Sequence, residues 1–221
     1  MASRPESDND MTISRDAGGA PAGNRKAASI LAAARELVLD HGFDAMTMDM
    51  VARQAPVSKA TLYAHFASKE ELFTAVVIDE ANRITGEIWR IMPDSDDVAG
   101  VLRRIAEKFV DVFLTEQAMF LQRAVIGAVS RFPSIGAAIF EAGPKALTER
   151  LATFLAGAHE RGLLNIQDPM LAARQFLSIV RGDLDIRGLL LPAVRPDRAQ
   201  IRKQVEAGID LFLHFYGSRR P

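Results

Sequence analysis

The stretch that most constrains the fold runs from Thr47 to Phe66, TMDMVARQAPVSKATLYAHF, and it predicts two short helices joined by a tight turn. Thr47 is placed to cap the first helix, and Pro56 and Val57 break it. Ser58 is placed to cap a second helix that continues through His65. Ala52 supplies the small residue that two steeply crossing helices need where their backbones approach. The pattern therefore predicts a helix-turn-helix.

The second of these helices presents side chains suited to a nucleic acid. Lys59, Thr61 and Tyr63 remain outward, and one cation with two hydroxyls can bond to phosphates and base edges. Such a helix suits the major groove of double-stranded DNA. The alternative is an ordinary helical hairpin that binds no nucleic acid.

The run VSKATLYAHFASKEELF, with Thr47 and Ala52 before it, closely resembles the amino-terminal DNA-binding domain of the TetR (tetracycline repressor) family of bacterial transcriptional regulators. The resemblance covers about Arg25 to Val77 and adds the start of the first helix to the expected interface. One departure is Pro56, where the family usually has glycine. Proline holds φ near about −65° and donates no N–H, so we expect the turn to differ locally. The residues predicted to contact DNA are Arg25, Lys26, Thr47, Ser58, Lys59, Ala60, Thr61, Tyr63, His65 and Lys69.

Composition narrows the other possibilities. The chain has 221 residues, 48% of them hydrophobic, which is enough for a sizeable core. Without cysteine there is no disulfide and no thiolate metal site, and the four histidines are scattered, so we expect no metal and no cofactor. Neither a membrane-spanning stretch of about 20 apolar residues nor a signal peptide is evident, so we expect a cytoplasmic protein. No nucleophile elbow or phosphate-binding glycine loop suggests an enzyme.

The apolar periodicity predicts an all-α fold of about nine helices. Residues 1–23 are rich in small and polar residues and are expected to form a disordered tail. Residues 24–68 form the three-helix DNA-binding domain, whose first helix ends at Gly42. Ser68 and Glu71 form a capping box that begins a long fourth helix, 69–92, leading into a helical regulatory and dimerisation domain over 69–221. Five further helices are expected over about 98–113, 120–129, 134–162, 168–191 and 196–217, and Gly143-Pro144 should kink or split the third of these.

The segment from Arg131 to Leu191 resembles the carboxy-terminal domain of AefR-like members of the same family. That resemblance implies a small-molecule effector, and the apolar character of the domain favours a hydrophobic or amphipathic one. Most aromatic residues at helical spacing are expected to be core, and Arg123 is expected to face solvent, an acidic partner such as Asp183 or Asp111, or a ligand carboxylate. The candidate ligand contacts are Trp89, Met92, Phe109, Phe113, Phe120, Arg123 and Phe176.

The last two helices are amphipathic and carry glycines, so they are expected to pair with their symmetry mates as a four-helix bundle. The predicted contacts of this homodimer are Phe176, Ile179, Gly182, Ile209 and Phe212. The function expected from these observations is a repressor that binds a palindromic operator and is released by an inducer. An activator or architectural DNA protein without ligand sensing is the alternative.

Overall fold

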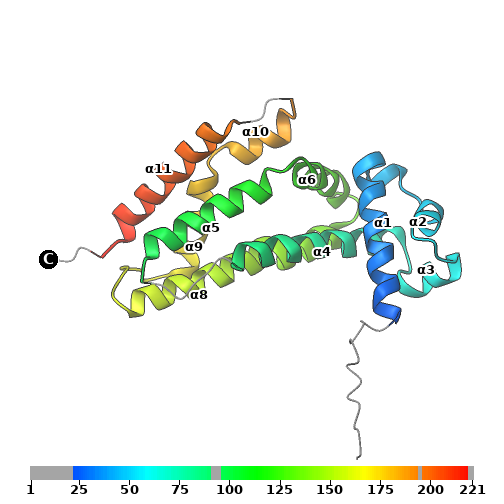
Figure 1. Cartoon of the computed structure of the whole chain (residues 1–221), viewed down its shortest axis with the longest axis horizontal. Coiled ribbons are helices and arrows are strands. Elements are labelled where there is room, and N and C mark those ends of the chain that lie inside the picture. Colours follow the sequence, from blue (N-terminus) through cyan, green and yellow to red (C-terminus); the bar gives the residue numbers. More distant parts are fainter. Residues whose placement is uncertain (1–21, 91–95, 194–195, 219–221) are drawn as a thin grey trace, which may run out of the picture.

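The computed structural model describes residues 22–90, 96–193 and 196–218, and these residues form an all-helical protein (Figure 1). Of the predicted tail, only Ala22 and Gly23 are described, and they belong to the first helix. Among the described residues, extended pairing is limited to one isolated bridge between Leu164 and Gly217. No helix in these ranges is both long and apolar enough to cross a bilayer. The helices are α1 (Ala22–Ala45), α2 (Met48–Gln54), α3 (Lys59–His65), α4 (Lys69–Trp89), α5 (Val98–Phe113), α6 (Glu116–Val129), α7 (Pro133–Phe140), a π-helical turn η1 (Glu141–Lys145), α8 (Ala146–Glu160), α9 (Pro169–Arg181), α10 (Leu184–Leu190) and α11 (Arg198–Tyr216).

The predicted caps of the helix-turn-helix are present. Thr47 Oγ1 accepts the Met50 N–H at 3.2 Å, and Ser58 Oγ accepts the Thr61 N–H at 3.0 Å. Gly42 interrupts the helical backbone of α1 with φ 80°, a conformation that glycine adopts without strain. The continuous helix therefore ends at Gly42 as predicted, and the three residues after it form a separate short helical turn that is counted with α1.

The turn between α2 and α3 closes at a residue with positive φ, although proline occupies that position. Pro56 has φ +22°, and the Val57 N–H donates to the Ala52 carbonyl at 3.1 Å across the end of α2. This six-residue closure belongs to the Schellman motif, in which the residue after the cap is left-handed. Proline lacks the N–H that would make the second bond of the motif. Pro56 therefore alters the turn as expected: its backbone is strained, and the hydrogen bond that an N–H at residue 56 would make is missing.

The long helix α4 runs from the α1–α3 end of the molecule toward the far end (Figure 1). Ser68 Oγ accepts the Glu71 N–H, while the Glu71 carboxylate accepts the Ala67 N–H at 2.8 Å instead of that of Ser68. Both contacts stabilise the start of the helix, as a capping box does. The helix ends at Trp89, three residues earlier than predicted, and Met92 lies outside the described residues.

The described residues form eleven α-helices instead of about nine, because two predicted helices are each divided. Pro144 lies inside the π-helical turn that separates α7 from α8, where its missing N–H disrupts the α-helical ladder. Gly182 ends α9 with φ 55° and separates it from α10. A Cβ at Gly182 would lie 2.7 Å from the side chain of Gln204 on α11, so the break also admits a close helix contact.

Two clusters of buried apolar side chains hold the fold together. The first joins α5, α8, α9 and α11, with Phe176 and Phe212 packed edge to face at 5.1 Å between ring centroids. The second contains the cores of α1 to α3 and the start of α4, together with Leu121 and Ala128 of α6 and Ile135 of α7. The apolar core of the predicted DNA-binding domain therefore extends across its predicted boundary at residue 68.

A chain of ion pairs follows one side of α4 from α1 to α5. Glu80 is buried and faces Arg35 of α1 at 3.3 Å and Arg83 of its own helix at 2.5 Å. Arg83 also contacts Glu87, which pairs with Lys108 of α5 at 2.9 Å. The buried carboxylate thus ties α1 to α4 by charge as well as by packing.

Candidate functional site

The outer face of α3 is polar and accessible, and its inner face anchors the helix. Leu62 is fully buried in the second cluster, whereas Lys59, Ala60 and Tyr63 are exposed. Thr61 and His65 are half-buried. Three of the residues predicted to reach DNA are therefore presented together on a short helix whose opposite side is fixed in a core.

Lys59, the cation of this face, already forms an ion pair. Lys59 Nζ lies 2.7 Å from Asp49 Oδ2 of α2, and both side chains are more than half exposed. Ser58 and Thr61 form a hydroxyl pair at 2.8 Å, so Ser58 serves the start of α3 as a cap. An exposed ion pair is worth at most about 1 kcal/mol, so Lys59 can leave Asp49 for a phosphate at small cost.

The remaining predicted DNA contacts flank α3. Thr47 is exposed at the start of α2, and Arg25 and Lys26 are exposed on the first turns of α1. Lys69 is half-buried, donates from Nζ to the Asp44 carbonyl at 2.8 Å, and lies 4.7 Å from the centre of the Phe43 ring. Burial lowers the pKa of Lys69, and the Asp44 carboxylate opposes that shift. Lys69 thus packs at the junction of α1 and α4 in this conformation.

Comparison with known families decides what this arrangement belongs to. A family model for the AefR-like transcriptional repressor, C-terminal domain, matches residues 100–218, more than half of the chain. A second model, for bacterial regulatory proteins of the tetR family, matches residues 30–76 and includes α2 and α3. The chain belongs to the TetR family. It is therefore a DNA-binding transcriptional regulator with a helix-turn-helix and not an enzyme, as predicted.

Individual TetR-family relatives are similar over different lengths. The HTH-type transcriptional activator FasR of Mycolicibacterium smegmatis is 36% identical over 102 residues, which is 44% of this chain and 47% of FasR. This match thus spans about half of that relative. The flavonoid-responsive regulator FrrA is 36% identical with TM-score 0.73, covering 89% of this chain and 100% of FrrA. A TetR-family regulator from Mesorhizobium loti is 26% identical with TM-score 0.84, covering 90% of this chain and 100% of its own.

The residues predicted to contact a ligand occupy different places in this TetR-family fold. Phe109 and Phe176 are buried in the first cluster, with Phe113 packed at its edge 5.3 Å from Phe109. Phe120 packs against the second cluster. Trp89 lines an open surface hollow with Arg150, Thr153 and Phe154, and its buried Nε1 has no hydrogen-bond partner among the described residues. Arg123 lines a separate pocket.

Most of the residues predicted to form the dimer interface are buried in the core of one protomer. Phe176, Ile209 and Phe212 are buried in the first cluster, Ile179 is half-buried, and Gly182 is exposed beside Gln204. The amphipathic pattern identified α9 and α11, but their most apolar faces pack against each other and against α5 and α8. What remains outward is a second stripe, with Leu171 of α9 and Leu211 and Phe215 of α11 exposed.

Helix α6 contacts the DNA-binding helices directly, which the sequence reading missed. Arg131, just past its end, pairs with Asp44 at 2.6 Å, and the Phe132 ring lies 6.0 Å from that of Phe43 in an edge-to-face contact. With Leu121 and Ala128 in the second cluster, α6 is a physical connection between the C-terminal helices and the helix-turn-helix. The sequence signal for this contact was the pair Arg131-Phe132, a basic residue directly before an aromatic one at the end of an apolar helix.

Proposed function

We propose that this TetR-family regulator is a repressor that binds a palindromic operator as a homodimer and dissociates when a small effector binds its C-terminal helices. The observation that carries the proposal is α3, whose exposed Lys59 and Tyr63 stand opposite a buried Leu62. A fixed helix with outward donors suits the major groove, where side chains read base edges and phosphates.

Two-fold symmetry supports the palindrome. The exposed apolar stripe of Leu171, Leu211 and Phe215 lies on α9 and α11 and gives a homodimer apolar surface to bury. A two-fold dimer presents two copies of α3, and such pairs engage half-sites about one helical turn, roughly 34 Å, apart. We assign the interface to this outer stripe, because Phe176, Ile209 and Phe212, three of the five residues first predicted for it, are buried within the protomer.

Effector release is supported by the connections between the two ends of the chain. Helices α4 and α6 both contribute to the second cluster, and the Glu80 and Asp44 ion pairs cross the same junction. An effector that favours a different placement of α4 or α6 therefore changes the spacing of the two α3 helices. A preference of a few kcal/mol between the two dimer states is enough to empty an operator. FrrA, 36% identical over 89% of this chain, is flavonoid-responsive, which supports a small aromatic effector here.

Operator affinity of α3 variants tests DNA binding. The operator is first selected from genomic fragments, and affinity is then followed by fluorescence anisotropy at several salt concentrations. Lys59→Ala and Tyr63→Ala are each expected to weaken binding by roughly 1 to 3 kcal/mol, and Lys59→Ala should reduce the salt slope by about one. Asp49→Asn should strengthen binding about two- to fivefold, because it frees Lys59 and removes a negative charge beside the phosphates.

Lys145→Ala is the matched control. Lys145 also forms an exposed ion pair, with Glu141, but it lies on η1, far along the chain from α3. Its removal takes away the same charge and should leave operator affinity unchanged. Equal affinities for wild type, Lys59→Ala and Tyr63→Ala would show that α3 is not the reading helix. A reporter gene downstream of the operator separates the remaining alternatives: repression relieved by an effector supports the proposal, and activation contradicts it.

A further inference from the structure

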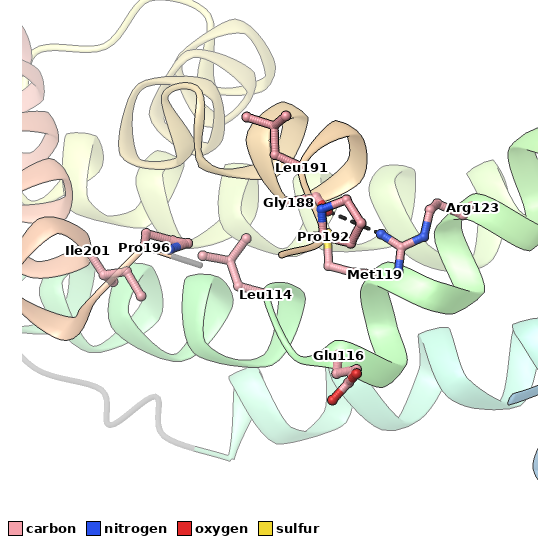
Figure 2. A pocket seen from close by; sticks show the side chains of 9 residues that line it. All are labelled: Leu114, Glu116, Met119, Arg123, Gly188, Leu191, Pro192, Pro196 and Ile201. Atoms are coloured by element: carbon pink, nitrogen blue, oxygen red, sulfur yellow. Dashed lines mark hydrogen bonds between the residues drawn. The ribbon is translucent and has the colours of Figure 1, made fainter. Parts of the chain in front are cut away.

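A pocket of about 120 Å³ lies between α6, α10 and the start of α11 (Figure 2). Helices α10 and α11 lie apart from α2 and α3 (Figure 1). Its walls are mainly apolar, from Leu114, Met119, Leu191, Pro192 and Ile201. Arg123 of α6 stands at one side and directs its guanidinium toward the backbone of α10. The pocket therefore combines a mainly hydrophobic lining with one guanidinium, that of Arg123, and one carboxylate, that of Glu116.

The charge of Arg123 is only partly satisfied. Its Nη1 donates to the Gly188 carbonyl at 3.1 Å, and no carboxylate in the described ranges forms an ion pair with it. Glu116 also lines the pocket, but Figure 2 shows its carboxylate directed away from the guanidinium. Of the two acidic partners expected from the sequence, Asp183 pairs with Arg187, and Asp111 is exposed on α5. A half-buried guanidinium bound to a single carbonyl keeps further N–H donors for an anion.

The chemistry of the walls selects the rest of the ligand. A carboxylate, phenolate or sulfonate accepts charge-assisted hydrogen bonds from a guanidinium, and these are about twice as strong as neutral ones. An aromatic or alkyl body would in turn cover Leu114, Leu191 and Ile201 and lose its contact with water. A neutral apolar molecule would leave the guanidinium unpaired, and a small inorganic anion would leave the walls wet.

We propose that the Arg123 pocket binds a small amphipathic anion, with Arg123 holding the anionic group and α10 and α11 holding the apolar body. The inference deepens the proposed function and rests on it for the meaning of the site as an effector site. The anion would accept from the N–H donors of Arg123 that the Gly188 carbonyl leaves free, and its body would contact Ile201, so it would bridge α6 to the start of α11. Because α6 also packs on the DNA-binding helices, this is a suitable place for an effector to act.

A pair of fluorescent probes tests the site on the full chain. Anilinonaphthalene sulfonate is an aromatic anion that fluoresces when it leaves water, and phenylnaphthylamine is its uncharged counterpart. Arg123→Met keeps the length of the side chain and removes the charge. We expect it to raise the Kd of the sulfonate about tenfold and to change that of the neutral probe less than about twofold, which is one charge-assisted contact at 1.4 kcal/mol per decade. Arg123→Lys should restore most of the affinity for the sulfonate.

Arg150→Met is the matched control, because Arg150 lines the other surface hollow with Trp89. It removes the same charge and should leave both probes unaffected. The proposal is overturned if Arg150→Met weakens the sulfonate as much as Arg123→Met does, or if neither variant weakens it. Leu114→Trp fills the pocket and should reduce binding of both probes, and unchanged binding in this variant also overturns the assignment. Thermal unfolding of each variant shows whether the chain still folds.

Operator affinity without probe keeps the two proposals apart. It is measured on the wild-type chain, because Arg123→Met also removes the contact between α6 and the Gly188 carbonyl. If probe binding depends on the charge of Arg123 but no specific operator is found, the anion site is confirmed and the proposed function as an operator-binding repressor is refuted. Normal operator binding with no charge-dependent probe binding would refute only the anion site.

Discussion

Removing the charge of Glu80 tests whether the junction between α1 and α4 is held by a buried carboxylate. Its side chain is 6% exposed, while those of Arg35 and Arg83 are 36% and 42% exposed. Breaking a fully buried ion pair costs about 3–5 kcal/mol. Here both arginines can rehydrate, and glutamine keeps one oxygen as an acceptor, so we expect Glu80→Gln to lower the free energy of unfolding by only about 1–2 kcal/mol.

Urea unfolding followed by circular dichroism measures this loss. With a slope near about 3 kcal/mol/M for a chain of this size, the midpoint should fall by roughly 0.5 M. Glu141→Gln is the control, because Glu141 forms an ion pair of the same kind with Lys145 at an exposed position on η1. Its removal should cost less than about 0.5 kcal/mol. Equal midpoints for the two variants would refute the argument that burial gives Glu80 its larger role.

Three further changes have outcomes that differ in sign or measurement. Pro56→Gly should raise the unfolding temperature. Glycine removes the backbone strain of a φ of +22°, roughly 1–3 kcal/mol, and this gain exceeds the cost of a more flexible unfolded chain, about 1 kcal/mol. A lower unfolding temperature would show that Pro56 is not strained. Leu211→Glu should give monomers in sedimentation, whereas Leu190→Glu on α10 should leave the dimer intact. A hydrogen bond from Arg103 lowers the pKa of Glu206 below its usual 4.5. The stabilisation by this ion pair is therefore present above pH 4.5 and is lost as the pH falls below it. The difference in unfolding temperature between wild type and Glu206→Gln should shrink at those low pH values.

The parts of the fold that depend on local chemistry were predictable from sequence. Thr47, Ser58 and Ser68 each satisfy the backbone N–H groups of the helix that follows, and this requires only the next three residues. The disruption at Pro144 is equally local, since a missing N–H acts wherever the helix lies. Gly182 was missed because a single glycine in a helical pattern is tolerated as often as it ends a helix.

The candidate sites were less predictable, because amphipathic patterns give the faces of a helix and not their partners. The apolar stripe of α11 was assigned to a second protomer, but Ile209 and Phe212 pack within the chain. Arg123 was expected to face solvent, an acidic partner or a ligand carboxylate, yet its acceptor is the carbonyl of Gly188, which carries no side-chain signal. The burial of Glu80 likewise depends on α1 lying against α4, a contact that joins residues 45 positions apart.

The second cluster has a consequence for how the chain loses its structure. Because Leu121, Ala128 and Ile135 complete the core of α1 to α3, the DNA-binding helices cannot separate from α6 and α7 without exposing apolar surface. The chain should then melt as one cooperative unit instead of as two domains. Operator DNA would in that case raise the melting temperature of the C-terminal helices, which it never touches, and a fragment ending near Trp89 would melt well below the intact protein.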